Sequence, residues 1–320
     1  MSLASPGGPE RLPLSANLKG IIAMVAAMAS FSVGDTIMKL VSATDMPTSE
    51  LIFVRGSVVL SAAIFIMIVW GGLEHIRQAL SWAMALRAGG DVGGGWFFQS
   101  GLARMPLADL MSVIQLTPLS ITAASAVFLG EKVGWRRWTA TGVGLVGVLL
   151  IIRPGSSAFN WWALAGIASV LCATVRDLAT RQVDRRVPAT MIMMLSALAV
   201  VLTSGAVAPF ANWSRPDAGS LALLACAAVC SLIGQLCVII AMRTGEVSAV
   251  APFRYAIIVF SLISSFLVWG YFPDRLTLAG IAIVAAAGLY TFRREQHLAR
   301  LRRMKELSES HGSPADRGAA

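Results

Sequence analysis

The sequence predicts an all-α integral membrane protein with ten transmembrane helices, arranged as two inverted five-helix repeats. Of the 320 residues, 56% are hydrophobic and 13% are charged, and the mean hydropathy is +0.72, which is far from the balance of a soluble globular chain. Apolar stretches long enough to cross a bilayer recur along the chain. Basic residues concentrate between alternate pairs of these stretches, as they do in membrane proteins.

Ten helices follow if each span needs about 20 apolar residues. The third and fifth are the weakest, because one is short and glycine-rich and the other is short. The residues between 73 and 86 either lie at the membrane interface or lengthen the third helix. The expected spans are 18–41, 51–70, 88–103, 107–129, 138–152, 161–180, 188–210, 220–242, 247–269 and 276–292.

The first helix carries the motif FSVGDTIMK, which places Asp35 and Lys39 inside an apolar run. A central charge costs about 3 kcal/mol on membrane-insertion scales, so Asp35 needs a partner. Lys39 lies one helical turn further on, where it can pair with Asp35 or extend to the interface. The motif indicates either a polar cavity within the bundle or a structural ion pair.

The second helix supplies two charges at matching depths. Arg55 lies about as far from the outer end of its helix as Asp35 does, and Glu50 matches Lys39. We therefore expect Asp35 to pair with Arg55 and Lys39 with Glu50, or exchange among all four. Such a cluster would form an outer gate.

The third helix combines a glycine run with Asp91, Trp96 and Gln99. Gly90 and Gly94 have the small-xxx-small spacing that lets helices approach closely, which we favour over a ligand role for this run. Trp96 lies mid-span rather than in an interfacial belt. It either stacks on a planar substrate, with Gln99 on the same wall, or packs against protein or lipid.

The fourth and ninth helices are interrupted by Pro118 and Pro252. Gln115 in the fourth helix corresponds to Arg254 in the ninth, which lies eight residues into its span within PFRY, beside Tyr255. These residues are predicted to face a midplane site where arginine's planar fork suits a carboxylate, phosphate or imide. Alternatively, Arg254 only neutralises Asp91 or Asp177.

The distribution of basic residues predicts the orientation. With the amino terminus inside, 18 of the 26 Lys and Arg residues fall in cytoplasmic segments and four in outer loops. We expect a multi-pass protein of the bacterial inner membrane with both termini cytoplasmic. The expected parts are a leader at 1–17, repeats at 18–153 and 159–293, and a basic tail at 294–320.

Several function classes are disfavoured by the sequence. The four cysteines lack CxxC or Cys/His spacing, the three histidines fall in predicted loops or the tail, and HExxH and GxSxG are absent. We therefore expect no enzyme, no cofactor, no metal site and no nucleic-acid partner, and a passive channel is a weaker alternative to a transporter. The partners expected are a small-molecule substrate and the lipid bilayer.

The two halves echo each other at an offset of about 140 residues. Asp35-x3-Lys39 reappears as Asp177-x3-Arg181, and Arg104 precedes a helix as Arg243 does. Five spans per half would invert the second half in the membrane, which is typical of transporters with a site near the midplane. The Asp177/Arg181 pair can equally be a simple pair at the membrane edge.

The stretch GLARMPLADLMSVIQLTPLSITAASAVFLGEKVGWRRW and the later AMRTGEVSAVAPFRYAIIVFSLISSFLVWGYFPDRLTLAG resemble paired EamA-type modules of the drug/metabolite transporter superfamily. The resemblance covers about 18–292. It implies alternating-access transport of a small organic metabolite through a central cavity. Trp96 and Arg254 favour an amphipathic planar substrate, such as a flavin or an aromatic amino acid. The alternative is an exporter of amino acids or other polar metabolites, and Asp35 or Asp91 is the candidate for proton coupling.

Overall fold

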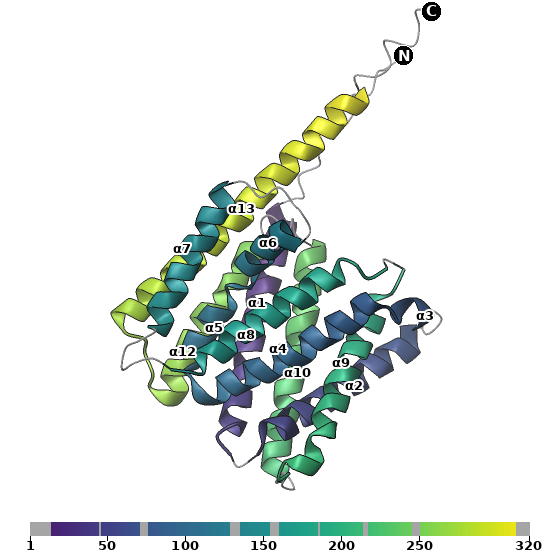
Figure 1. Ribbon diagram of the computed structural model, residues 1–320, viewed down its shortest axis with the longest axis vertical. Coiled ribbons are helices and arrows are strands. Elements are labelled where there is room, and N and C mark those ends of the chain that lie inside the picture. The colour runs from purple at the N-terminus through teal and green to yellow at the C-terminus, as the bar shows by residue number, and fades with distance from the viewer. Residues whose placement is uncertain are drawn as a thin grey trace, which may run out of the picture.

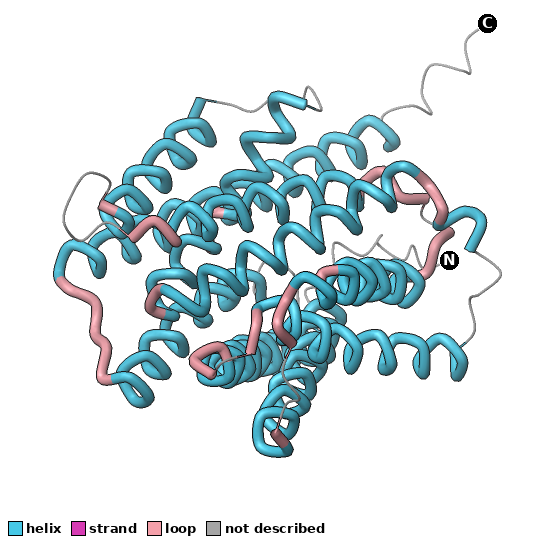
Figure 2. The backbone as a smooth tube through the Cα atoms, turned by 60° about the horizontal axis from the view of Figure 1, so that its bottom comes forward, coloured by secondary structure: helices cyan, strands magenta, loops and turns pink. Residues whose placement is uncertain are grey.

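The fold is seen in a computed structural model, which describes residues 14–311 apart from 45, 71–75, 129–134, 154–159, 185, 214–216 and 245–249. The described residues form helices joined by turns and loops, and this part of the chain contains no strand (Figure 2). The predicted all-α class is therefore correct. The leader at 1–17 lies mostly outside the described residues.

The described residues of the first half form seven helical segments. They are α1 (Leu14–Val41), α2 (Thr48–Trp70), α3 (Ile76–Ala79), α4 (Trp82–Arg104), α5 (Leu107–Ile114), α6 (Thr117–Phe128) and α7 (Trp135–Ile152).

The described part of the second half is also mainly helical. Its segments are α8 (Ala163–Thr180), α9 (Ala189–Ala206), the 3-10 turn η2 (Ala208–Phe210), α10 (Ala218–Thr244), the 3-10 turn η3 (Ala251–Tyr255), α12 (Ala256–Trp269) and α13 (Arg275–His311).

Eight segments in the described part are long and apolar enough to cross a membrane. α4 and α7, the two predicted as weakest, are not among them. The apolar part of α7 is the shorter stretch Trp138–Ile152. α4 has 23 residues and begins at Trp82, six residues before the predicted start. Ser81 caps it by accepting a hydrogen bond from the Met84 N–H (3.2 Å), so the uncertain residues before 88 lengthen this helix.

Prolines shape two of the spans as predicted. α5 ends at Ile114 and α6 begins at Thr117, so the span Leu107–Phe128 is broken just before Pro118. Pro252 lies in η3, directly before α12. A proline lacks the N–H that would continue an α-helix through its own position, which explains both interruptions.

Helices from opposite halves pack side by side throughout the bundle (Figure 1). α1 lies against α10, α4 against α8, α2 against α9, and α7 against α13. Glycines allow the closest approaches: a Cβ added to Gly90 would lie 2.8 Å from the Cys172 carbonyl, and one on Gly147 would lie 2.9 Å from the Gly280 carbonyl. The glycine run therefore packs α4 tightly onto α8.

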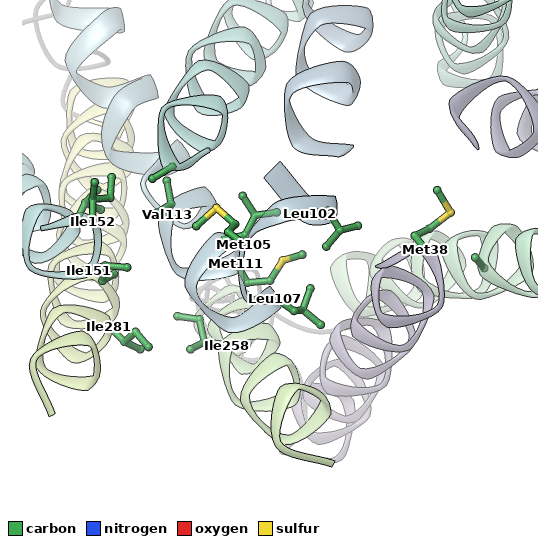
Figure 3. Packing of buried hydrophobic residues seen from close by; sticks show 14 of the residues in the cluster. Met38, Leu102, Met105, Leu107, Met111, Val113, Ile151, Ile152, Ile258 and Ile281 are labelled. Atoms are coloured by element: carbon green, nitrogen blue, oxygen red, sulfur yellow. The ribbon is translucent and has the colours of Figure 1, made fainter. Parts of the chain in front are cut away.

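The largest buried apolar cluster lies where α1, α4, α5 and α12 meet (Figure 3). Met38, Leu102, Leu107 and Ile258 are among its members, each no more than 4% exposed. This cluster fixes the end of α1 and the α4–α5 connection relative to α12. Those segments surround the site described below.

The bundle has two distinct ends. At one, called here the pocket end, α1, α4 and α12 finish and α5 and α13 begin. At the other, called the tail end, α13 continues well beyond its membrane-length segment Arg275–Arg294 and projects from the bundle (Figure 1).

Candidate functional site

A pocket of about 390 Å³ opens among the segments that meet at the pocket end. Its walls come from the last turn of α1, the α4–α5 connection, the end of α12 and the loop after α12. The lining residues are Lys39, Ala103, Arg104, Met105, Pro106, Leu107, Ser265, Trp269 and Tyr271. The pocket therefore combines two cationic side chains with two aromatic ones.

Lys39 is held against the pocket wall by the backbone of α4. Its ammonium donates to the carbonyl oxygens of Leu102 (2.7 Å) and Met105 (2.6 Å), and lies 5.5 Å from the ring centroid of Trp269. The carbonyls are at the end of a helix, where a positive charge is favoured. An ammonium has three N–H donors, so these two contacts leave one for a ligand.

Arg104 and the aromatic residues form the rest of the polar rim. The Arg104 guanidinium stacks over the ring of Trp162, 4.1 Å from its centroid, and its backbone carbonyl accepts a hydrogen bond from Asn160 (3.1 Å). Trp269 offers a ring beside the Lys39 charge. An acidic group and a planar apolar group can thus be bound next to each other.

Tyr271 links the pocket to a half-buried carboxylate. Its hydroxyl donates to Asp109 Oδ2 (2.8 Å) in the first turn of α5. Burial raises the pKa of Tyr271 above its ordinary value, and the nearby Asp109 carboxylate raises it further, so the hydroxyl stays protonated at physiological pH.

Beyond Tyr271, the loop is anchored by an ion pair. Both carboxylate oxygens of Asp274 accept hydrogen bonds from Arg153, and the Thr277 N–H donates to Asp274 Oδ1 (3.1 Å). The hydrogen bond from Arg153 holds the pKa of Asp274 well below its ordinary value.

The two ion pairs predicted from matching depths do not form among the described residues. Lys39 binds backbone carbonyls rather than Glu50, which is itself 2% exposed. Arg55 donates to Ser231 Oγ on α10 (2.9 Å), and its charge acts on Asp35 from beyond hydrogen-bonding distance. Depth along a helix does not fix the direction in which a side chain points, and here α10 and α4 supply nearer partners.

Asp91 instead belongs to an ion-pair network between α4 and α8. Its carboxylate lies 3.6 Å from Arg87 Nη2 and 3.4 Å from Arg176 Nη1, and Arg176 Nε donates to Asp177 (2.7 Å). The neutralising partner of Asp91 and Asp177 is therefore Arg176, and Arg254 does not serve that role.

The remaining predicted residues of the first half lie away from the pocket lining. Gln99 is buried and donates to Ser42 Oγ (2.6 Å), so it joins α4 to the end of α1. Trp96 is half-buried in α4, and Gln115 forms the end of α5 at the break in that span.

Arg254 and Tyr255 are found in η3, at the opposite end of α12 from Trp269. Arg254 is exposed and lies in the 3-10 turn that interrupts the ninth span; the start of that span lies outside the described residues, so the depth of Arg254 stays a prediction. α12 begins at Ala256, directly after the 3-10 turn. The Tyr255 hydroxyl is buried and has no hydrogen-bond partner in the described part of the chain.

Of the nine predicted site residues, Lys39 alone lines the pocket. The sequence analysis gave no site role to Arg104, Trp269, Tyr271 or Asp109. Asp109 had a usable signal, because a carboxylate within the apolar stretch MPLADLM is the same anomaly that singled out Asp35. No linear pattern brings Tyr271 to it, since the two residues are 162 positions apart.

In a comparison with known proteins, both halves of the chain match the same protein family. The model of the EamA-like transporter family matches residues 18–153 and again 160–293. A riboflavin transporter of Rhizobium johnstonii is 27% identical over 70% of this chain and 74% of its own.

Other relatives match more of the chain. A pseudopaline exporter, CntI, of Pseudomonas aeruginosa is 28% identical over 84% of this chain and 94% of its own. An S-adenosylmethionine uptake transporter of Rickettsia felis is 26% identical over 94% of this chain and 98% of its own. A crystal structure with 20% identity matches with a TM-score of 0.57 over 87% of this chain and 96% of its own, which supports the fold.

Proposed function

This chain belongs to the EamA-like transporter family, and from that premise we propose that it moves a small organic metabolite across the membrane by alternating access. The observation that carries the proposal is the pocket at the pocket end, where Lys39 and Arg104 lie beside Trp269 and Tyr271. A chain with several membrane-length helices and such a pocket can receive a solute at one membrane face.

The pocket's chemistry favours an amphipathic planar substrate that carries an acidic group. The free N–H of Lys39 would bind a carboxylate or phosphate, and Trp269 would contact the planar part. Aromatic amino acids and flavin phosphates have this combination. A polycarboxylate metabolite is the second candidate, because Lys39 and Arg104 together offer two cations and one relative is a pseudopaline exporter.

The transport cycle proposed here uses ten spans in two inverted repeats, with α4 and α7 as the two that fall short in hydropathy or length. The helix contacts support this symmetry. In such a repeat α1 corresponds to α8, α2 to α9, α4 to α10 and α7 to α13. The contact of α1 with α10 then corresponds to the contact of α8 with α4, and the pairs α2–α9 and α7–α13 each join two corresponding helices. Each pair exists in the fold. Alternating access would then rock the halves against each other.

The proposed location is a bacterial inner membrane, with both termini cytoplasmic and the pocket facing outward. The basic segment after Phe292 lies at the tail end, which supports a cytoplasmic position for that end.

Two experiments test this proposal in sequence. Thermal-shift screening of purified protein against aromatic amino acids, flavins and polycarboxylates should identify a stabilising metabolite. Uptake of that metabolite into proteoliposomes should then saturate with concentration, whereas a channel would give a flux proportional to concentration. Absence of any saturable flux for every stabilising metabolite would contradict the proposal.

A further inference from the structure

Asp109 is a half-buried carboxylate behind the pocket. One oxygen, Oδ2, accepts a hydrogen bond from Tyr271, whose side chain lines the pocket. The other, Oδ1, is fully shielded from solvent and has no hydrogen-bond partner among the described residues. A carboxylate in this setting is held by a single hydrogen bond, which is unusual because buried carboxylate oxygens are normally satisfied.

Tyr271 sits on a short connection that is fixed at both ends. Gly270 ends α12 in the left-handed conformation (φ 65°), which glycine adopts without strain. Asp274 is held by Arg153, whose own backbone is left-handed (φ 51°), and by Thr277. Between these points Tyr271 reaches from the pocket wall to Asp109. A change in the charge of Asp109 would therefore act on the Tyr271 side chain at the pocket.

The charged groups around Asp109 come from three further segments. Lys39 lies on α1, Arg153 follows α7, and Asp274 precedes α13. Arg153 and Asp274 bind each other, and Lys39 is held by carbonyls, so none of them forms an ion pair with Asp109 among the described contacts. The hydrogen bond from Tyr271 is thus the direct polar contact that stabilises the ionised carboxylate.

We propose that Asp109 and Tyr271 form a proton-sensitive latch on the pocket, closed when Asp109 is ionised and loosened when it takes up a proton from water. The Tyr271 hydroxyl then donates to a carboxylate, and such charge-assisted hydrogen bonds are roughly twice as strong as neutral ones. Protonation forms one O–H bond on the Asp109 carboxyl and removes its charge, and the weakened hydrogen bond releases Tyr271. In this proposal the proton-sensitive carboxylate is Asp109, and not Asp35 or Asp91.

This inference rests on the proposed function for its biological meaning, but its test needs no substrate. The four natural cysteines are replaced with alanine, and a reporter is introduced as Ala103→Cys in the pocket wall. Asn212→Cys, on an exposed loop, supplies a reference thiol outside the pocket. The rate of alkylation by a polar maleimide is measured in detergent between pH 5 and pH 8, as the ratio of reporter to reference.

The latch predicts that this ratio rises several-fold from pH 8 to pH 5. With Tyr271→Phe the ratio should be high at every pH, and with Asp109→Asn it should not vary with pH. The matched control is Asp217→Asn, an exposed carboxylate that caps α10 and should leave the rise unchanged. A flat ratio in the parent protein, or an equal rise in both Asp109→Asn and Tyr271→Phe, would overturn the proposal. A normal rise in a protein that transports none of the screened metabolites would instead count against the proposed function alone.

Discussion

Two polar clusters inside this bundle differ in what stabilises their charged side chains: oppositely charged side chains in one, and neutral groups in the other. Between α4 and α8, Arg176 contacts both Asp91 and Asp177, and Arg87 adds a second cation, so the charges neutralise each other. At the pocket end, Lys39 binds carbonyls and an aromatic ring, while Asp109 binds a tyrosine hydroxyl. Charges that neutralise one another hold helices together, whereas charges held by neutral groups remain available to a ligand or a proton.

The largest effect should follow from breaking the neutralised cluster. Arg176→Met leaves Asp91 and Asp177 without their shared guanidinium. Because these side chains are up to about a third exposed, the expected cost is about 2 kcal/mol, below that for a fully buried pair. We expect a clear fall in the thermal midpoint in detergent. Arg77→Met, at an exposed position on α3, is the control and should change little. An unchanged midpoint for Arg176→Met would show that the cluster is not structural.

At the pocket, the largest effect should be on transport rather than stability. Lys39→Gln keeps an N–H donor for the carbonyls of Leu102 and Met105 but removes the positive charge offered to a substrate. We expect at least a tenfold loss of uptake, about 1.4 kcal/mol, with the thermal midpoint nearly retained. Lys19→Gln, an exposed position on the same helix, should transport normally. Normal uptake by Lys39→Gln would remove the pocket from the transport cycle.

Asp35, within α1, tests whether a carboxylate without an ion-pair partner matters more for transport than one in the neutralised cluster. It has no ion-pair partner within 4 Å in the described part of the chain, although Arg55 acts on it from a distance. We expect Asp35→Asn to lower uptake several-fold while expression stays largely intact. Asp91→Asn is the matched variant in the neutralised cluster, and its uptake should change less than its stability. The reverse pattern would place the functional carboxylate on α4.

The smallest effect concerns the pair of Arg153 with Asp274. Because Arg153 holds the pKa of Asp274 below its ordinary value of about 3.9, this pair stabilises the fold above that pH. The contribution is lost as the pH falls through the lowered pKa. In Asp274→Asn we expect a slightly lower thermal midpoint at pH 7 and no difference from the parent at very low pH. An equal difference at both pH values would rule out the carboxylate's charge as the cause.

Much of the fold could be predicted from the sequence, because hydrophobic length and glycine and proline chemistry act locally. The breaks near Pro118 and Pro252 and the tight packing of α4 follow from such local rules. The third helix was predicted too short, since its first turn is amphipathic and capped by Ser81 rather than continuously apolar.

The site was harder to predict because its residues meet only through the packing of distant helices. Lys39 could be identified as a site residue from the sequence, because a charged side chain in an apolar run costs free energy in whichever direction the side chain points. Its contacts with Leu102, Met105 and Trp269 depend on how α4 and α12 cross α1, which no spacing in the sequence records.

The central claim is that substrate binds in the pocket at the pocket end, and one measurement tests it most directly. In the cysteine-free background, the metabolite identified by thermal shift is added to the Ala103→Cys reporter during alkylation by maleimide. We predict that a saturating concentration slows labelling at this position at least fivefold while labelling of Asn212→Cys is unchanged. Labelling of the pocket cysteine at an unaltered rate, under conditions where the metabolite stabilises the same protein, would contradict the claim.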